Sequence, residues 1–316
     1  MLAPPGMIYD IASESGPSGT TNFALAKIRE NGQITILPQF PPGAVTPWSG
    51  GVAGLVIGTD GNLYGIGYVP SITSANENYV FRVTPSGAYS LLASFPVSPY
   101  APNQPALVAA SDGNLYVATG GAGVNRTGAV YQVPLSGQVQ KVASFPAKGL
   151  AFPGTLMEAA DGNLYGTTSS YQVFKYDLTT KALTNVYQLA TSGSQGACPC
   201  QMVQGTDGKL YAASVGGGAP PGIGLVFSLD IGLPKPLAVV TGLYPSSGPV
   251  GQQVILWGNY LLGATAVTFN GVPATTFQVT SMRSIKVTVP AGATTGPVSV
   301  TTANGTSAKT QTFTVK

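Results

Sequence analysis

The sequence predicts an all-β protein: a β-propeller of about five four-stranded units, followed by a small immunoglobulin-like β-sandwich. Only 8% of the 316 residues are charged, while Gly (42) and Pro (26) are abundant, as expected where many turns join short strands. A phrase of the form Asp-Gly-Xaa-Leu-Tyr recurs about every 50 residues, which is a period typical of propeller blades. After about residue 235 the phrase disappears and a new pattern of short strands begins.

The first unit, residues 7–40, fits the repeat but lacks an opening strand. Ile8-Tyr9 corresponds to the Leu-Tyr of the phrase, 23–28 to the third strand and 31–40 to the last hairpin. Residues 1–6 or the linker could supply the missing strand, the natural chain could begin earlier, or the ring could stay open. An open ring would expose a strand edge that invites pairing with another chain.

The next four units each begin with a short apolar run and the repeated phrase. Asp-Gly between two β-type runs is a hairpin signal, because Gly tolerates the positive φ of a tight turn. We assign the Asp to capping of its own turn, and the Leu and Tyr to packing between units. The four phrases are Asp60–Tyr64, Asp112–Tyr116, Asp161–Tyr165 and Asp207–Tyr211.

A second hairpin follows the first in each of these units. Its first strand is expected at Phe81–Val83, Val130–Val133, Val173–Tyr176 and Val226–Leu229. Four strands per unit without helical periodicity are typical of propeller blades. One such sheet leaves apolar faces exposed, and radial stacking of the sheets buries them.

These units resemble the GloVer-type tandem repeat of bacterial extracellular proteins. Residues 112–145 and 214–227 carry the resemblance, which covers residues 7–235, while Ser169–Gln172 replaces the glycine-rich stretch in one unit. The resemblance implies the propeller fold and a secreted or anchored protein, and it implies no particular reaction.

The C-terminal module follows the linker Leu233–Pro236, so the predicted domains are 1–235 and 236–316. Asn270-Gly271 is a strong type I′ hairpin signal among several short strands. Residues 245–251, 257–259, 267–271 and 289–300 resemble the IPT/TIG immunoglobulin-like module. That resemblance implies a spacer or interaction domain, often beside carbohydrate-active or adhesive domains. Trp257 is assigned to the sandwich core rather than to a sugar-binding platform.

Composition excludes several classes of partner. The net charge is +3 and no Lys/Arg run occurs, so nucleic-acid binding is not expected. No run of 18 apolar residues is present, so no membrane span is expected. Residues 1–6 do not form a signal peptide. Composition nevertheless favours an extracellular or cell-surface location, with an export signal that was removed or lies upstream.

The sequence contains no catalytic constellation. His is absent, which removes Ser-His-Asp and Cys-His triads and argues against propeller lyases that depend on His. Cys198 and Cys200 are expected to form a local disulfide or remain thiols, and two thiolates are too few for a zinc site. No calcium or phosphate loop is present, so no cofactor is expected. Glu158 is expected on an inner strand facing the channel, without the second acid that glycoside hydrolysis needs.

The sequence therefore favours a non-catalytic binding or scaffold protein of the cell exterior, with a glycan or protein ligand on the propeller loops. Aromatic and amide side chains of the loops are the candidate surface, although local plugs under loops are a competing interpretation. A self-assembling structural or adhesive protein, pairing through the open edge or the TIG-like module, is one alternative, and a carbohydrate-active enzyme is another. The candidate surface residues are Trp48, Tyr100, Asn103, Gln104 and Phe152.

Overall fold

The computed structural model describes most of the chain, and every regular element in that part is a β-strand. This confirms the all-β prediction. The described residues are 2–3, 7–15, 21–29, 33–37, 55–69, 77–96, 106–120, 128–145, 155–168, 170–189, 199–214, 224–308 and 310–316.

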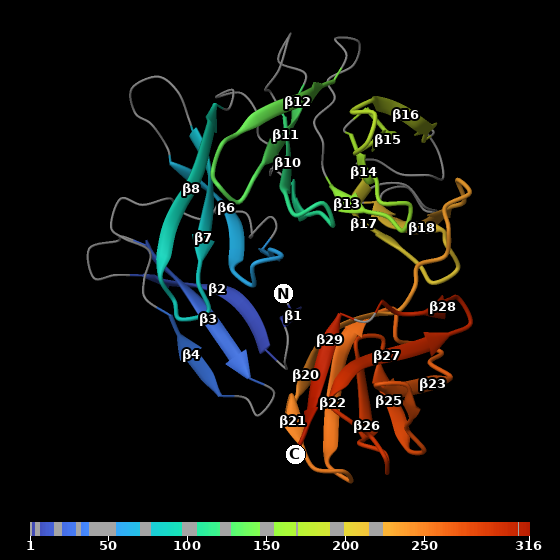
Figure 1. Cartoon of the computed structure of the whole chain (residues 1–316). Helices are drawn as coiled ribbons and strands as arrows, with labels where there is room; N and C mark the ends of the chain where they lie inside the picture. Colours follow the sequence, from blue (N-terminus) through green and yellow to red (C-terminus); the bar gives the residue numbers. More distant parts are fainter. Residues whose placement is uncertain are drawn as a thin grey trace.

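Five antiparallel sheets follow one another along the chain and form an arc (Figure 1). The first contains β1 (Leu2–Ala3), β2 (Met7–Ser15), β3 (Thr21–Arg29) and β4 (Ile34–Ile36). The second contains β5 (Val56–Ile57), β6 (Leu63–Val69), β7 (Glu77–Val83) and β8 (Tyr89–Pro96). The third contains β9 (Ala106–Ala109), β10 (Leu115–Thr119), β11 (Ala129–Val133) and β12 (Gln140–Ser144). The fourth contains β13 (Met157–Glu158), β14 (Leu164–Thr167), β15 (Gln172–Tyr176) and β16 (Leu183–Gln188). The fifth contains β17 (Pro199–Gln204), β18 (Leu210–Ser214) and β19 (Leu225–Leu229).

Among the described residues, the first unit has all four strands and the last unit has three. Leu2 pairs with Ile8 and Ala3 with Met7, so the short strand β1 supplies the opening strand that the sequence analysis found missing. The fifth sheet has three strands in the described part of the chain, and β19 leads into the linker instead of a fourth strand. Of the alternatives that the sequence left open for the first unit, the one in which residues 1–6 supply the opening strand is therefore confirmed.

The repeated phrase forms the same turn in each of the four units that contain it. Asp60 accepts the backbone N–H of Asn62 at 3.1 Å through Oδ1 and the hydroxyl of Tyr64 at 2.7 Å through Oδ2. The corresponding Tyr-to-Asp hydrogen bonds in the next three units measure 2.8, 2.9 and 2.7 Å. Gly61 has φ +77°, the left-handed conformation that favours glycine after the Asp. The phrase therefore couples a turn cap to a tyrosine on the adjoining strand.

Adjacent sheets pack through alternate faces of their strands. We call the face that carries the tyrosine of the phrase the forward face, and the opposite one the back face. The forward face of one sheet packs against the back face of the next, which confirms that these Leu and Tyr residues pack between units. Between the second and third sheets, Tyr64 and Val80 pack against Leu115 and Val133. Between the third and fourth sheets, Tyr116 and Val130 pack against Leu164 and Phe174. Between the fourth and fifth sheets, Tyr165 and Val173 pack against Leu210 and Leu229.

The C-terminal part is a two-sheet sandwich, as predicted. One sheet contains β20 (Val239–Tyr244), β22 (Gln253–Asn259), β25 (Phe277–Ser281) and β26 (Ser284–Thr288). The other contains β21 (Ser247–Gly248), β23 (Ala266–Phe269), β24 (Val272–Pro273), β27 (Gly296–Thr302), β28 (Gly305–Thr306) and β29 (Gln311–Val315). Phe269 and Phe313 meet edge to face in the core, with ring centroids 5.3 Å apart. Asn270 and Gly271 have positive φ angles of 45° and 85°, as a type I′ turn requires.

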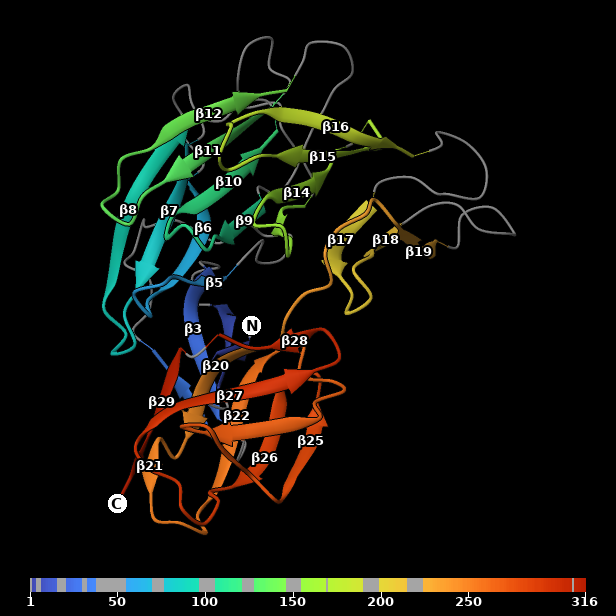
Figure 2. The same ribbon diagram turned by 45° about the vertical axis from the view of Figure 1, so that its right-hand side comes forward.

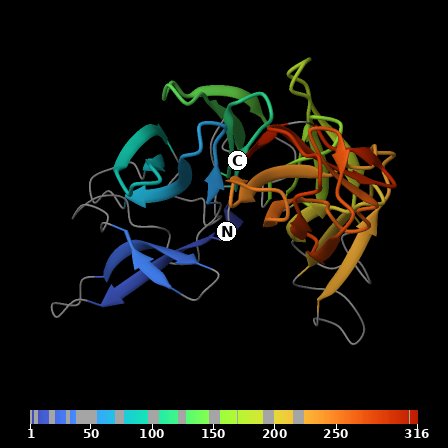
Figure 3. The ribbon, with the colours of Figure 1, turned by 60° about the horizontal axis from the view of Figure 1, so that its bottom comes forward.

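The sandwich lies across the open side of the arc, between its first and last sheets (Figures 1 and 2), and Figure 3 shows the same arrangement from another side. Hydrogen bonds join it to the last sheet and to the linker. The Asn304 side-chain amide donates to the carbonyl of Thr206 at 2.8 Å and to that of Pro236 at 3.1 Å. The Gln204 side chain also donates to the carbonyl of Pro234, at 2.9 Å. These bonds fix the entry of the chain into the sandwich.

Candidate functional site

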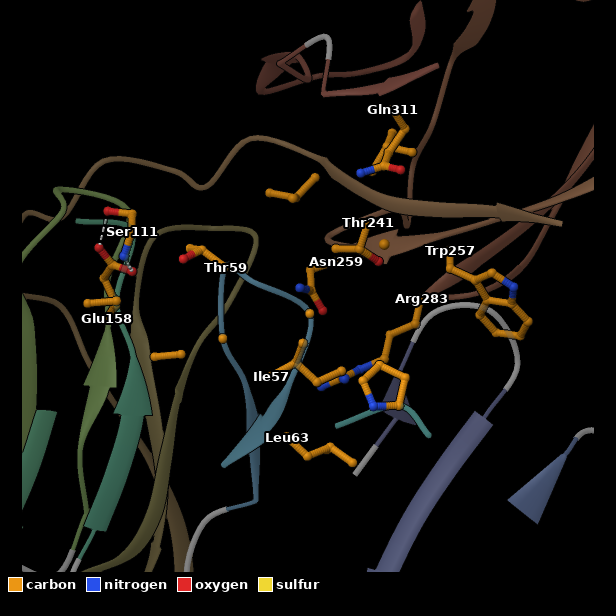
Figure 4. A pocket seen from close by; sticks show the side chains of 18 of the residues that line it. Ile57, Thr59, Leu63, Ser111, Glu158, Thr241, Trp257, Asn259, Arg283 and Gln311 are labelled. Carbon is orange, nitrogen blue, oxygen red and sulfur yellow. Dashed lines mark hydrogen bonds between the residues drawn. The ribbon is translucent and has the colours of Figure 1, made fainter. Parts of the chain in front are cut away.

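A cavity of about 820 Å³ lies between the inner strands of the arc and the outer face of the sandwich (Figure 4). Both domains contribute to its wall. The arc contributes turns and inner strands of the second, third and fourth sheets, together with Lys27 of the first. The sandwich contributes residues of β20, β22 and β29 and the turn before β26. The cavity therefore exists only where the two domains meet.

On the arc side, equivalent residues of three successive units line the cavity. Ile57, Ala109 and Glu158 each stand three residues before the repeated Asp, and all three line the cavity. Gln204 holds the same position in the fifth sheet. Because stacked sheets repeat the same geometry, the inner strand ends of successive units meet at one surface.

Glu158 is the acid that the sequence analysis expected at the channel, and the structure places it in the cavity wall. Its Oε2 accepts the backbone N–H of Ser111 at 2.9 Å, and its Oε1 accepts the Ser111 hydroxyl (Figure 4). Gln204 does the same one unit later, because its Oε1 accepts the backbone N–H of Ala160 at 2.8 Å. We call this arrangement the inter-unit clasp. The carboxylate of Glu158 is thus engaged in joining two sheets.

The sandwich side carries Trp257, which the sequence analysis assigned to the core. That assignment was wrong. Val254 and Leu256 of β22 point into the core and are fully buried, so Trp257 and Asn259 fall on the opposite, outer face of the strand. Trp257 is half-buried, and its indole N–H is buried without a hydrogen-bond partner in the described part of the chain. The strict alternation of apolar residues along β22 is the sequence signal that would have placed it correctly.

Polar and charged groups converge between the two walls. Figure 4 shows the Arg283 side chain lying between Ile57 and Trp257, with Asn259 on the same side of Trp257 as Ile57. The Arg283 guanidinium lowers the pKa of the neighbouring Tyr260 hydroxyl, but burial has the larger effect and raises that pKa overall. Of the described lining residues, Lys27 and Arg283 are the cations and Glu158 is the acid. The lining is therefore mixed, with a small excess of positive charge.

The remaining predicted site residues lie outside the described residues: Trp48, Tyr100, Asn103, Gln104, Phe152 and Cys198. Cys200 is described only through its backbone in β17. Within the described ranges, no three His, Cys, Asp or Glu residues stand close enough together to hold a metal ion. The same ranges contain no helix with the length and hydropathy needed to cross a membrane.

Two family models match the chain. The model described as the Gloeobacter/Verrucomicrobia repeat matches residues 51–272, and the IPT/TIG domain model matches residues 238–315. Both resemblances found in the sequence are therefore confirmed. The two matches overlap at residues 238–272, and in the structure this stretch belongs to the sandwich.

No curated protein matches the chain, whereas many solved structures do. Virginiamycin B lyase from Staphylococcus aureus is 14% identical, with 89% of this chain and 99% of that chain covered and a TM-score of 0.43. A puromycin hydrolase is 16% identical, with 81% and 42% covered and a TM-score of 0.44. A fungal alcohol oxidase of the AA5 family, in complex with copper, is 12% identical, with 97% and 85% covered and a TM-score of 0.31. Likeness at this level carries no inference about activity.

Proposed function

We propose that this chain, which belongs to the Gloeobacter/Verrucomicrobia repeat family and contains an IPT/TIG domain, is an extracellular, non-catalytic binding protein. Its binding site is the cavity that the two domains form together. Its ligand is a neutral, hydroxyl-rich molecule such as an oligosaccharide, held in the cavity between the arc and the TIG domain. The observation that carries the proposal is the convergence of amide, hydroxyl and indole groups from both domains on one cavity.

The chemistry of the lining suits a sugar. Asn259 and Gln311 offer side-chain amides, and Thr59 and Thr241 offer hydroxyls, each able to donate to and accept from a sugar hydroxyl. The indole of Trp257 offers an apolar ring face against which a sugar can pack. A volume of 820 Å³ also falls within the range of about 300–1,000 Å³ typical of small-molecule sites.

The cavity walls are held in place before any ligand arrives. Asn304 bonds the TIG domain to the last sheet and the linker, and Glu158 and Gln204 join successive sheets. A site whose walls are already fixed loses less conformational entropy on binding than one that must assemble. A cavity with fixed walls can therefore bind a ligand through a small number of polar contacts, which supports a binding role.

The acid in the wall supports binding rather than turnover. Hydrolysis of a glycoside needs two carboxyl groups facing the same bond. Glu158 is the one acid among the described lining residues, and two hydrogen bonds from Ser111 already occupy its carboxylate. A carbohydrate-active enzyme is therefore the weaker alternative at this site.

A glycan array with the full chain, followed by calorimetric titration of the best ligand, tests the proposal. Trp257→Ala and Asn259→Ala are each expected to weaken binding by about tenfold or more, as for a central contact in a binding site. Gln278→Ala, an exposed amide on β25 outside the cavity lining, is the matched control and keeps wild-type affinity. The bound glycan is recovered intact by chromatography.

Two results would count against this assignment. Unchanged affinity in both cavity variants, with loss of binding in Trp48→Ala or Tyr100→Ala, would move the site to the propeller loops. Cleaved glycan in the recovered sample would make the protein an enzyme, and Glu158→Gln would then show whether that acid takes part.

A further inference from the structure

The outer edge of the last sheet has no neighbouring strand in the part of the chain that the structure describes. In the other four units the third strand pairs on both sides, and its outer partner is β4, β8, β12 or β16. In the described part of the chain β19 pairs only with β18. Figure 2 shows β19 at the margin of the arc, where the chain turns away toward the TIG domain. No described strand pairs with its backbone N–H and C=O groups on that side, and an unpaired strand edge is a template for another chain.

The forward face of the same sheet is uncovered as well. The third strand of each of the second to fifth units carries a valine at the same position of the forward face. This valine is 0% exposed at Val80, 0% at Val130 and 1% at Val173, but 76% exposed at Val226. Val203 on β17 is 59% exposed on the same face. The last unit thus keeps the apolar residues of a packed unit at positions that no described residue covers.

The strand itself carries no device that blocks pairing. Proteins commonly protect an exposed edge with lysine, proline or a β-bulge. The strand β19 reads Leu-Val-Phe-Ser-Leu, and its ladder with β18 runs from Leu225 to Leu229 without a register shift. An unprotected, regular and largely apolar edge is a template for an added strand.

We propose that β19 pairs antiparallel with β19 of a second copy, about a two-fold axis at Phe227. The alternate residues of the strand, Leu225, Phe227 and Leu229, read the same in either direction, with a leucine at each end and phenylalanine in the centre. Pairing in this register sets Phe227 opposite its symmetry mate and Val226 opposite Ser228. Leu225 then faces Leu229, and the two phenylalanines face each other, and these apolar pairs across the new ladder stabilise the strand pair.

The symmetry of the contact sets the size of the assembly. A two-fold contact uses the same surface on both partners and closes at a dimer, whereas head-to-tail stacking of exposed sheet faces would generate rings or filaments. The new six-stranded sheet places a repeat domain and a TIG domain on each side. Two copies of the ligand cavity would then belong to one particle.

Light scattering coupled to size exclusion, on the full chain at several protein concentrations, tests this inference. Wild type is expected at twice the monomer mass. Val226→Lys, which places a charge on the pairing strand at an exposed position, is expected to be monomeric. Val203→Lys is the matched control: it adds the same charge to the same face, but on β17, and it remains dimeric.

Cross-linking tests the register independently. In a background lacking Cys198 and Cys200, the double variant Val226→Cys/Ser228→Cys is expected to form an interchain disulfide, because the two positions face each other across the axis. Val226→Cys alone faces serine and stays uncoupled. A monomeric wild type at all concentrations overturns the proposal. Loss of the dimer in Val203→Lys as well overturns it in favour of packing between sheet faces.

Discussion

The hydrogen bond between Tyr116 and Asp112 offers a direct test of why the repeated phrase contains both residues. The Tyr116 ring is fully buried between the third and fourth sheets, and its hydroxyl donates to Asp112 at 2.8 Å. Tyr176 lies 6.1 Å away between ring centroids, is equally buried, and its hydroxyl has no hydrogen-bond partner among the described residues. Tyr116→Phe and Tyr176→Phe therefore make the same chemical change in one cluster with opposite consequences.

The expected magnitudes follow from the partner of each hydroxyl. A hydrogen bond to a charged group contributes about 1.5–3 kcal/mol. Asp112 is exposed and keeps the backbone N–H of Asn114 at 3.0 Å, so water can replace the lost donor and the cost lies near the lower limit. Tyr116→Phe should thus lower the unfolding free energy by about 1.5 kcal/mol, or the Tm by about 3–6 °C. Removal of the Tyr176 hydroxyl should leave stability unchanged or raise it by less than about 1 kcal/mol.

The two variants are compared by calorimetry and by urea unfolding at neutral pH. Burial raises the pKa of Asp112, but the hydrogen bonds from Asn114 and Tyr116 outweigh it and hold the pKa below the ordinary value. The stabilising bond is therefore fully present above about pH 4 and weakens as the pH falls through the pKa of the folded state. The difference between wild type and Tyr116→Phe should shrink in acid. Equal loss of stability in the two variants would show that ring packing, and not the hydrogen bond, governs this position.

Three further predictions concern pH, packing and the clasp. Burial and the hydrogen bond to Asp60 raise the pKa of Tyr64 from 10.0 to about 12. The contribution of the protonated hydroxyl to stability is therefore present below pH 10 and is lost as the pH rises toward 12. The urea midpoint should fall across that window and stay constant below it. In Gly65→Ala the new Cβ would clash with the ring of Phe81, at a cost of about 1–3 kcal/mol, and the second change Phe81→Leu should recover part of it in a double-mutant cycle. Ala109→Glu should form a clasp hydrogen bond to Thr59, which raises the Tm and weakens glycan binding measured by calorimetry. The control Ala109→Leu, which cannot form this hydrogen bond, should not raise the Tm.

The repeat could be predicted because its signal is local. The Asp-Gly turn, the Leu-Tyr pair and the second hairpin each occupy a few consecutive residues, and the structure confirms their order and phase, except that the last unit lacks the second strand of its second hairpin among the described residues. The sequence named residues 1–6 only as one possible source of the first unit's opening strand, because β1 is only two residues long and carries no pattern of its own. Its pairing with Met7 and Ile8 depends on the neighbouring strand rather than on its own residues.

The site was less predictable because its contacts cross the repeat. Glu158 was expected on an inner strand, but its bond to Ser111 joins residues 47 positions apart, and only the stacking of sheets brings them together. The cavity also needs the TIG domain across the open side of the arc, which no local pattern in either domain specifies. Trp257 is different, since strand alternation with Val254 and Leu256 was readable in advance.

The clasp explains why the cavity opens where it does. Glu158 and Gln204 each reach back to the residue before the repeated Asp of the preceding unit. The same position in the third unit is Ala109, which is too short to reach Thr59, so the polar groups of Thr59 remain at the cavity wall. A ligand hydroxyl placed there would make the contact that a clasp side chain makes in later units. The Leu, Tyr and Asp residues that hold the stack recur in four units, while the residue at the clasp position differs in each. The repeat can therefore keep its packing constant while the clasp position varies for recognition.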